Sequence, residues 1–259
     1  MTTLKFAKQI AKKVYITLDP INVSAYRWLR GYRGPIPSAA NRIRIGCISI
    51  SKFRRSGWNS YEPIQNALQK YYGRKNGRVL DFGCGPGRIL QFLVGSGFEL
   101  HGTDVDSSAI DFVLSTFPTV QAKTNKFTPP LEYPSAYFDI IYSVSIWTHL
   151  PPAMQEPWLR EIRRILKPGG IALLTTIGAY GYRKGTHLSD VTFSLDDLLK
   201  TGFQHSVYAN PNASPGTDLS YGAAYHTPDY VRKEWGRIFD VLEIQEGVVD
   251  DLNDLVILV

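Results

Sequence analysis

The sequence predicts an α/β fold in which helices flank a mainly parallel sheet. Short apolar runs that are typical of buried strands, such as Phe138–Ser143, alternate with stretches in which apolar residues recur at helical spacing. One such run, ending at Val79 and Leu80, passes through a glycine-rich turn straight into the next helical pattern. With 259 residues, 44% of them apolar, the chain can form one large globular domain or two small ones.

Composition narrows the class of protein. No apolar run approaches the roughly 20 residues that span a bilayer, and the N-terminus lacks the pattern of a secretory signal. The two cysteines, Cys47 and Cys84, are too few for a disulfide framework, and no cluster has the spacing of metal ligands. We therefore expect a cytoplasmic protein without a bound metal.

Charge is distributed unevenly along the chain. Residues 1–56 contain twelve Lys or Arg and a single acid, Asp19, whereas the remainder has 17 basic and 22 acidic residues. We therefore expect the front of the chain to face an anionic surface or ligand. Within it, residues 4–18 predict a basic amphipathic helix. This helix either contacts an anionic membrane or packs on the domain, and the second arrangement is the commoner one.

The other elements follow in order. Residues 31–46 are rich in Gly, Pro and Arg, so we expect an irregular segment there. Residues 49–58 place arginines beside aromatics, a combination that can hold nucleic acid. Periodicity predicts helices over 61–72, 88–94, 107–114, 154–166 and 228–239, and strands over 98–104, 119–124, 138–143, 171–176, 241–244 and 255–259. Residues 178–227 have no regular period, which is typical of a lid when a connection is this long.

The glycine turn is the main candidate for ligand binding. It reads Asp81-x-Gly83-x-Gly85-x-Gly87, so it matches neither the dinucleotide pattern nor the Walker pattern. Glycines let the backbone of such a turn pass close to a ligand, and the following helix points its free N–H groups at the same place. The carboxylate of Asp81 favours a positively charged ligand rather than a pyrophosphate.

Asp104 is the second candidate. It ends the next predicted strand, 23 residues after Asp81, where a carboxylate can accept hydrogen bonds from both hydroxyls of a ribose. Alone, Asp104 could instead cap the following helix, but Asp106 is better placed as the cap. We therefore predict that Asp104 binds the ribose of a nucleoside.

Later motifs extend the pattern. They read Phe138-Asp-x-Ile141, Ser143-x-Ser145-x-x-Thr148-His149-Leu150 and Leu166-Lys-Pro-Gly-Gly170, in that order. Together with the glycine turn, they resemble the motifs of class I S-adenosylmethionine-dependent methyltransferases. Within this class they are most similar to small-molecule enzymes in which Thr-His-Leu follows the fourth strand. The resemblance covers residues 60–177 well and the two termini loosely.

The resemblance implies a Rossmann-like sheet of seven strands in the order 3-2-1-4-5-7-6, with the last strand antiparallel and helices on both sides. It divides the chain into a basic N-terminal extension or flap, residues 1–58, and a methyltransferase domain, residues 59–259, with a substrate lid at 178–228. S-adenosylmethionine is the implied cofactor. The residues implied to bind it are Asp81, Gly83, Cys84, Gly85, Asp104, Val105, Asn125 and Ser143. Asn125 departs from the family, which often has an aspartate there to reach the adenine amino group, although its carbonyl can accept the same bond.

The chemistry suggests a base. Methyl transfer from a sulfonium is an in-line displacement that needs positioning and the exclusion of water rather than a metal. A hydroxyl acceptor must also lose a proton, and His149, just past the end of the fourth strand, is the candidate general base. It could instead orient Trp147 or stack near the cofactor. Trp147, Tyr225 and His226 are the candidates for contact with the acceptor.

These observations predict O-methylation of a small-molecule or glycan-like acceptor. The alternatives are N-methylation of a small amine, or a cofactor-binding or membrane-associated protein without catalysis. A nucleic-acid acceptor is disfavoured because Thr128-Pro129-Pro130-Leu131 lacks the aromatic of the base-flipping signature.

Overall fold

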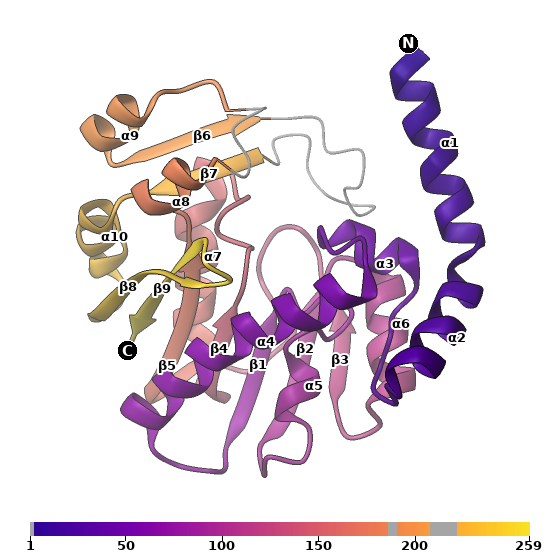
Figure 1. Cartoon of the computed structure of the whole chain (residues 1–259). Helices are drawn as coiled ribbons and strands as arrows, with labels where there is room; N and C mark the ends of the chain where they lie inside the picture. Colours follow the sequence, from indigo (N-terminus) through magenta and orange to yellow (C-terminus); the bar gives the residue numbers. More distant parts are fainter. Residues whose placement is uncertain (1–2, 186–190, 208–221) are drawn as a thin grey trace.

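The computed structural model describes residues 3–185, 191–207 and 222–259. Its centre is a seven-stranded sheet of order β3-β2-β1-β4-β5-β9-β8, which confirms the predicted order (Figure 1). β9 runs antiparallel to both of its neighbours, and the pairs from β3 to β5 are parallel, as expected. The strands are β1 Arg78–Phe82, β2 Glu99–Asp104, β3 Gln121–Thr124, β4 Phe138–Ser143, β5 Leu166–Thr176, β8 Val241–Val249 and β9 Asn253–Leu258.

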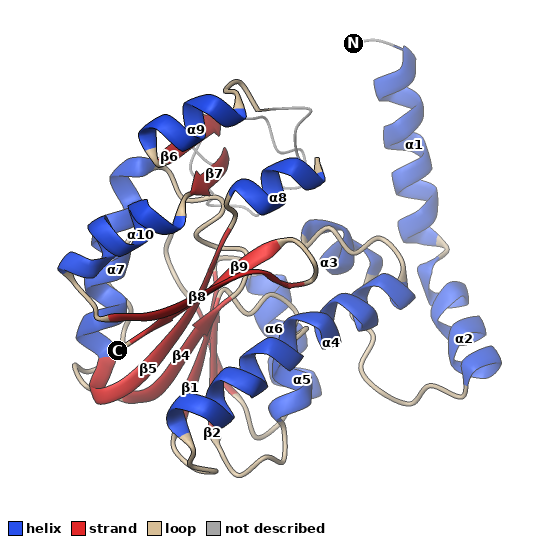
Figure 2. Cartoon of the chain, turned by 60° about the vertical axis from the view of Figure 1, so that its left-hand side comes forward, coloured by secondary structure: helices blue, strands red, loops and turns tan. Residues whose placement is uncertain are grey.

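Helices cover both faces of this sheet (Figure 2). They are α1 Thr3–Thr17, α2 Asp19–Arg30, α3 Ala39–Arg44, α4 Ile50–Ala67, α5 Leu90–Leu93, α6 Ser107–Thr116, α7 Pro152–Ile165, α8 Ala179–Lys184, α9 Leu195–Thr201 and α10 Pro228–Glu234. A π-helical turn, Leu68–Tyr72, extends α4, and a 3₁₀ turn, Trp235–Arg237, extends α10.

Two apolar cores lie on opposite faces of the sheet because successive strand residues point to opposite sides. Val79 packs with side chains of α4, α5 and α6, whereas the next residue, Leu80, packs with side chains of α7 and α10. Both are fully buried. Burial of a side chain of this size stabilises the fold by about 1.5–3 kcal/mol, so the alternation fixes which face each helix covers.

The N-terminal half differs from the prediction in two places. Residues 39–44, expected to be irregular, form α3, with Ser38 as its N-cap. Residues 49–58 and 61–72, expected to be a flap and a separate helix, form one helix, because its buried positions recur every three or four residues from Ile50 to Ala67. The predicted division of the chain at residues 58 and 59 therefore falls inside α4.

The segment expected to lack regular structure also contains some. Besides α8 and α9, it forms a two-stranded antiparallel sheet of β6 Phe203–Val207 and β7 Gly222–His226. Glycine, alanine and polar residues fill much of these strands, so no apolar alternation marks them in the sequence. Part of the predicted lid, residues 186–190 and 208–221, lies outside the described residues.

The predicted N-terminal helix is present as α1, followed closely by α2, and both lie at the edge of the molecule (Figure 1). α1 is attached to the body through Tyr15, whose hydroxyl donates to the carbonyl oxygen of Ile48 at 2.7 Å, whereas Ala11, Val14 and Leu18 of its apolar stripe are exposed. In the described parts of the chain, no helix is long and apolar enough to cross a membrane.

Candidate functional site

A cavity of about 550 Å³ lies at the carboxyl ends of β1, β2 and β4. The glycine turn after β1 and the residues that follow β2 form one part of its wall, and α3 and α4 contribute another. Parallel sheets bind ligands at this edge. Seven of the eight predicted cofactor-binding residues line the cavity: Asp81, Gly83, Cys84, Gly85, Asp104, Val105 and Asn125.

The glycine turn needs its glycines. Gly83 and Gly85 have φ values of +80° and +51°, which side chains rarely adopt. A Cβ on Gly83 would also lie 2.3 Å from the Cδ1 of Ile146. The turn is held against β2 by the N–H groups of Gly83 and Cys84, which donate to the carbonyl oxygen of Thr103 at 2.8 and 2.9 Å. A ligand can therefore approach the backbone closely here.

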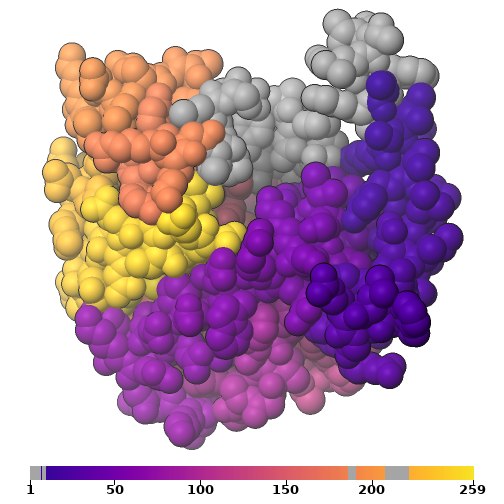
Figure 3. Space-filling model, viewed as in Figure 1, coloured from indigo at the N-terminus to yellow at the C-terminus, as the bar shows by residue number. Residues whose placement is uncertain are grey.

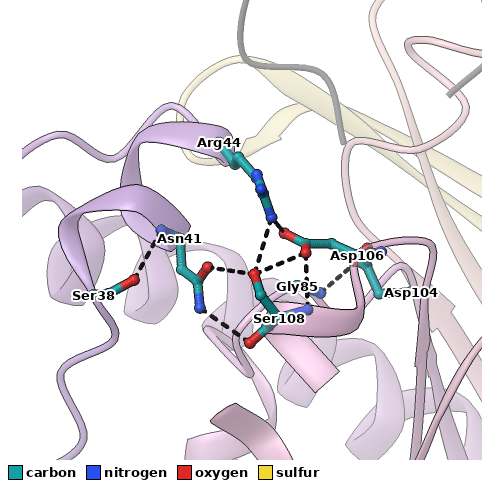
Figure 4. A network of polar contacts seen from close by, with 7 residues as sticks. All are labelled: Ser38, Asn41, Arg44, Gly85, Asp104, Asp106 and Ser108. Carbon is teal, nitrogen blue, oxygen red and sulfur yellow. Dashed lines mark hydrogen bonds and ion pairs between the residues drawn. The ribbon is translucent and has the colours of Figure 1, made fainter. Parts of the chain in front are cut away.

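Asp104 is held in place by the same turn (Figure 4). One of its carboxylate oxygens accepts from the N–H of Gly85 at 2.7 Å, and the other accepts from the N–H of Asp106 at 2.9 Å. Burial raises the pKa of Asp104. Each carboxylate oxygen keeps a second lone pair, so Asp104 retains the capacity to accept two further hydrogen bonds, as a ribose requires.

Asp81 lies at the start of the turn and is only 2% exposed. Tyr142 donates a hydrogen bond to it at 2.9 Å. Burial, with a further contribution from the charge of Asp104, raises the pKa of Asp81 to about 8. A cationic ligand in the cavity would lower the cost of ionising both carboxyls, so the pair favours a positively charged group.

Asn125 supplies an unused acceptor. Its side-chain N–H₂ donates to the carbonyl oxygen of Lys126 at 2.7 Å, which leaves its Oδ1 pointing elsewhere. This Oδ1 is buried and has no hydrogen-bond partner in the described part of the chain. Buried polar atoms are rarely left unpaired, and the adenine amino group is a donor of the kind that would satisfy this one.

A polar network that the sequence did not indicate connects α3 to the start of α6 (Figure 4). Arg44 forms an ion pair with Asp106 and donates to the Oγ of Ser108 at 3.0 Å. Asn41 donates to the carbonyl oxygen of Ser108 at 3.3 Å. Asp106 also caps α6, as predicted. Because Asn41 and Arg44 line the cavity, the network fixes α3 as part of the cavity wall.

His149 lines the cavity from the segment that follows β4. Its Nδ1 lies 2.8 Å from the carbonyl oxygen of Gly222, in β7. A carbonyl oxygen can only accept, so Nδ1 carries the proton and the lone pair of the neutral ring is on Nε2. The N–H of Gly222 also donates to the carbonyl oxygen of His149, at 3.3 Å. β7 therefore sets both the position and the tautomer of this histidine.

The hairpin between β8 and β9 contributes further lining residues that the sequence did not indicate. Asp250 accepts hydrogen bonds from two residues of α4, Ser56 at 2.8 Å and Asn59 at 3.1 Å. Asn253 lies 3.5 Å from the Oγ of Ser145 through its side-chain nitrogen. These positions lie beyond residue 177, where the sequence motifs end, so only the folding of the hairpin onto the cavity reveals them.

Four predicted site residues are not among the described residues that line the cavity. Trp147 is fully buried and packs against Trp235 at 5.1 Å between ring centroids. Tyr225 is 1% exposed and packs among aromatic side chains, and His226 is fully buried beside Gln155. Ser143 is fully buried within β4. Strand alternation and packing place these four side chains inside the protein, away from the described lining of the cavity.

The arrangement fits S-adenosylmethionine. The buried carboxyls of Asp81 and Asp104 match its positive charges and its ribose, and the unpaired Oδ1 of Asn125 matches its adenine. The glycine turn lets the cofactor approach the protein backbone closely. In the described residues, no group of three or more His, Cys, Asp or Glu could hold a metal ion.

Comparison with known proteins agrees with this assignment. A family described as "Methyltransferase domain" matches residues 54–228. The tRNA N(3)-cytidine methyltransferase METTL2 of Gallus gallus is 27% identical over 146 residues, which cover 50% of this chain and 38% of that protein. The malonyl-[acyl-carrier protein] O-methyltransferase of Enterobacter lignolyticus is 30% identical over 109 residues, covering 41% of each. The chain therefore spans less than half the length of these two relatives.

Solved structures share the fold. The PH0226 protein of Pyrococcus horikoshii superposes with a TM-score of 0.58 at 19% identity, over 79% of this chain and 89% of that one. The 1,6-didemethyltoxoflavin-N1-methyltransferase of Burkholderia thailandensis, solved with 1,6-didemethyltoxoflavin and S-adenosylhomocysteine, gives 0.54 at 18% identity, over 88% and 92%.

Proposed function

Because this chain belongs to the methyltransferase domain family, we propose that it transfers the methyl group of S-adenosylmethionine to a hydroxyl of a small-molecule or glycan-like acceptor, with His149 as the general base. The contact between the Nδ1 of His149 and the carbonyl oxygen of Gly222 is the observation that carries this proposal. When bound, S-adenosylmethionine supplies a methyl group on a sulfonium, which is already activated for in-line displacement.

The cofactor-binding roles follow from the cavity wall. Asp104 would accept hydrogen bonds from the ribose hydroxyls, and Asn125 would accept one from the adenine amino group. Asp81 would balance the positive charge at the other end of the cofactor. The glycine turn allows this close approach. Ser145, Ile146 and His149, which follow β4, line the same cavity and would be the residues beside the transferred methyl group.

His149 accepts the proton of the acceptor. A hydroxyl is a poor nucleophile until its proton is removed, and a base within hydrogen-bond reach assists that removal during the transfer. The proton on Nδ1 stays bonded to Gly222, so Nε2 is the atom that takes up the hydroxyl proton. The resulting imidazolium is stabilised by the same carbonyl oxygen. Ile146, Leu150 and Phe127 line the cavity nearby and limit the access of water to this step.

An oxygen acceptor is favoured over nitrogen because a neutral amine has its own lone pair and needs no base for attack. The O-methyltransferase of Enterobacter lignolyticus is a relative with an oxygen acceptor, whereas METTL2 acts on tRNA cytidine. Nucleic acid therefore enters the test as an alternative acceptor.

The experiment measures S-adenosylhomocysteine formed by the purified chain with three acceptor sets: hydroxylated small molecules and glycans, small amines, and tRNA. We expect product with the first set and a loss of at least about tenfold in turnover for His149→Ala. Turnover with amines or tRNA alone would contradict the choice of acceptor. Cofactor binding without product in all three sets would favour a binding protein that does no catalysis.

A further inference from the structure

The two N-terminal helices expose an apolar surface that the proposed reaction does not use. On α2, Ile21, Trp28 and Leu29 are 67%, 83% and 68% exposed. On α1 and at its end, Ile10, Val14 and Leu18 are each about half exposed. We call these six residues the apolar stripe. In the space-filling view, the indigo α1 and α2 form an outer edge of the molecule (Figure 3).

The spacing of the apolar stripe keeps it on one side of each helix. Ile10, Val14 and Leu18 are four residues apart, and Trp28 and Leu29 follow Ile21 by seven and eight. The helices join closely, since the N–H of Ile21 donates to the carbonyl oxygen of Leu18 at 3.1 Å. Each helix therefore carries a row of large exposed apolar side chains, whereas scattered single ones would need no explanation.

The other side of the same helices is attached to the body. Tyr15 donates to the carbonyl oxygen of Ile48 at 2.7 Å, and Arg54 donates to the hydroxyl of Tyr26 at 3.0 Å. Asp19 forms a buried ion pair with Arg42 in α3. These contacts attach α2 and the C-terminal end of α1 to the body, while the apolar stripe stays exposed.

Charge indicates what covers the stripe. Residues 3–33 contain seven basic residues, Lys5, Lys8, Lys12, Lys13, Arg27, Arg30 and Arg33. Their single acid, Asp19, is already paired with Arg42. A second copy of this surface would bring like charges together, whereas an anionic lipid surface attracts them. The highly exposed Trp28 suits the same environment, because indole rings favour the boundary between headgroups and acyl chains.

We propose that α1 and α2 dock on an anionic lipid surface, with the apolar stripe at the boundary between headgroups and acyl chains. This docking goes beyond the proposed reaction and does not depend on it. α3 couples the two, because Arg42 holds α2 while Asn41 and Arg44 in the same helix line the cofactor cavity. Docking therefore fixes the orientation of the cavity relative to the lipid surface.

Vesicle flotation of the full chain tests the proposal without cofactor or acceptor. We expect the chain to float with phosphatidylcholine vesicles that contain about one third phosphatidylglycerol, and at least about tenfold less with phosphatidylcholine alone. The variant Ile21→Glu/Leu29→Glu is expected to lose flotation. The control Leu199→Glu/Leu242→Glu changes the charge equally at exposed apolar positions of α9 and β8, and is expected to float like the wild type.

Three outcomes would overturn the proposal. The first is equal flotation of the stripe variant and the wild type, and the second is no flotation of the wild type. The third is a concentration-dependent dimer in sedimentation that the stripe variant abolishes, which would identify a second copy as the occupant. An unchanged thermal unfolding temperature and an unchanged heat of cofactor binding for both variants would confirm that they fold. A failure of methyl transfer leaves the flotation result intact, so the two proposals fail separately.

Discussion

The Nδ1 of His149 lies 2.8 Å from the carbonyl oxygen of Gly222, so β7, in the segment predicted to be a lid, holds a histidine that follows β4. This contact leaves Nε2 as the nitrogen that the proposed mechanism uses as the base. It also connects two segments that are 73 residues apart in the chain.

Replacement of His149 by alanine is expected to lower turnover at least about tenfold, because the acceptor loses the group that takes its proton. The cofactor affinity should stay near that of the wild type, since the residues proposed to bind the adenosyl group lie on or just after β1, β2 and β3. Steady-state kinetics and calorimetry measure the two quantities. Unchanged turnover would remove His149 from the mechanism.

Replacement of Asp104 by asparagine is expected to weaken cofactor binding by about tenfold to a hundredfold, because hydrogen bonds to charged acceptors contribute about 1.5–3 kcal/mol. Calorimetric titration with S-adenosylhomocysteine measures this change. Asp111→Asn, on the exposed side of α6, is the matched control and should bind normally. Equal affinities of the two variants would refute the ribose assignment.

Asn125 allows a test of adenine recognition. Asn125→Ala removes the unpaired Oδ1 and is expected to weaken binding about two- to tenfold, the effect of one neutral hydrogen bond. Asn125→Asp keeps an acceptor and should bind within about twofold of the wild type. If the two variants bind equally well, the adenine amino group has another partner.

The raised pKa of Asp81 predicts how the stability of the cofactor-free chain depends on pH. Its pKa is raised from 3.8 to about 8, so between these values the folded chain binds a proton more tightly than the unfolded chain. The contribution of Asp81 to stability is therefore lost as pH rises, by at most about 1.4 kcal/mol per pH unit. In thermal unfolding, the stability of Asp81→Asn relative to the wild type should therefore increase as the pH rises from about 5 to about 8, by a few kcal/mol at most. Parallel profiles would contradict the burial of a titrating carboxyl.

The ion pair of Asp19 and Arg42 predicts a strong asymmetry between single and double variants. Asp19→Leu leaves a buried guanidinium without its partner and is expected to cost about 3–5 kcal/mol. Asp19→Leu/Arg42→Leu removes both charges and should cost clearly less than Asp19→Leu alone. Denaturant unfolding measures both, and additive losses would show that the two residues do not interact.

The cofactor half of the site was accessible from sequence because its signals are local. A glycine turn after an apolar strand places Asp81 and Gly83, and the end of the next strand places Asp104, whatever the rest of the chain does. The strand order followed from the same motifs through family resemblance, and the structure confirms it.

The other half of the site depends on contacts between distant segments. Arg44 meets Asp106 across 62 residues, and Asp250 meets Ser56 across 194. No local pattern in the sequence indicates such pairs. Trp147 shows the opposite difficulty, because its position beside His149 in the chain suggested a ligand contact, yet packing against Trp235 directs its ring into the core.

The partner of His149 is a main-chain oxygen rather than a side chain, which has a consequence for how this enzyme could diversify. The bond that orients His149 comes from the main chain of residue 222, so it does not depend on the identity of the other β7 side chains. Position 222 itself is the exception, since a Cβ there would meet the carbonyl oxygen of Ser206 at 2.1 Å. The bond that orients His149 therefore depends on a glycine at position 222 rather than on the side chain of any other β7 residue.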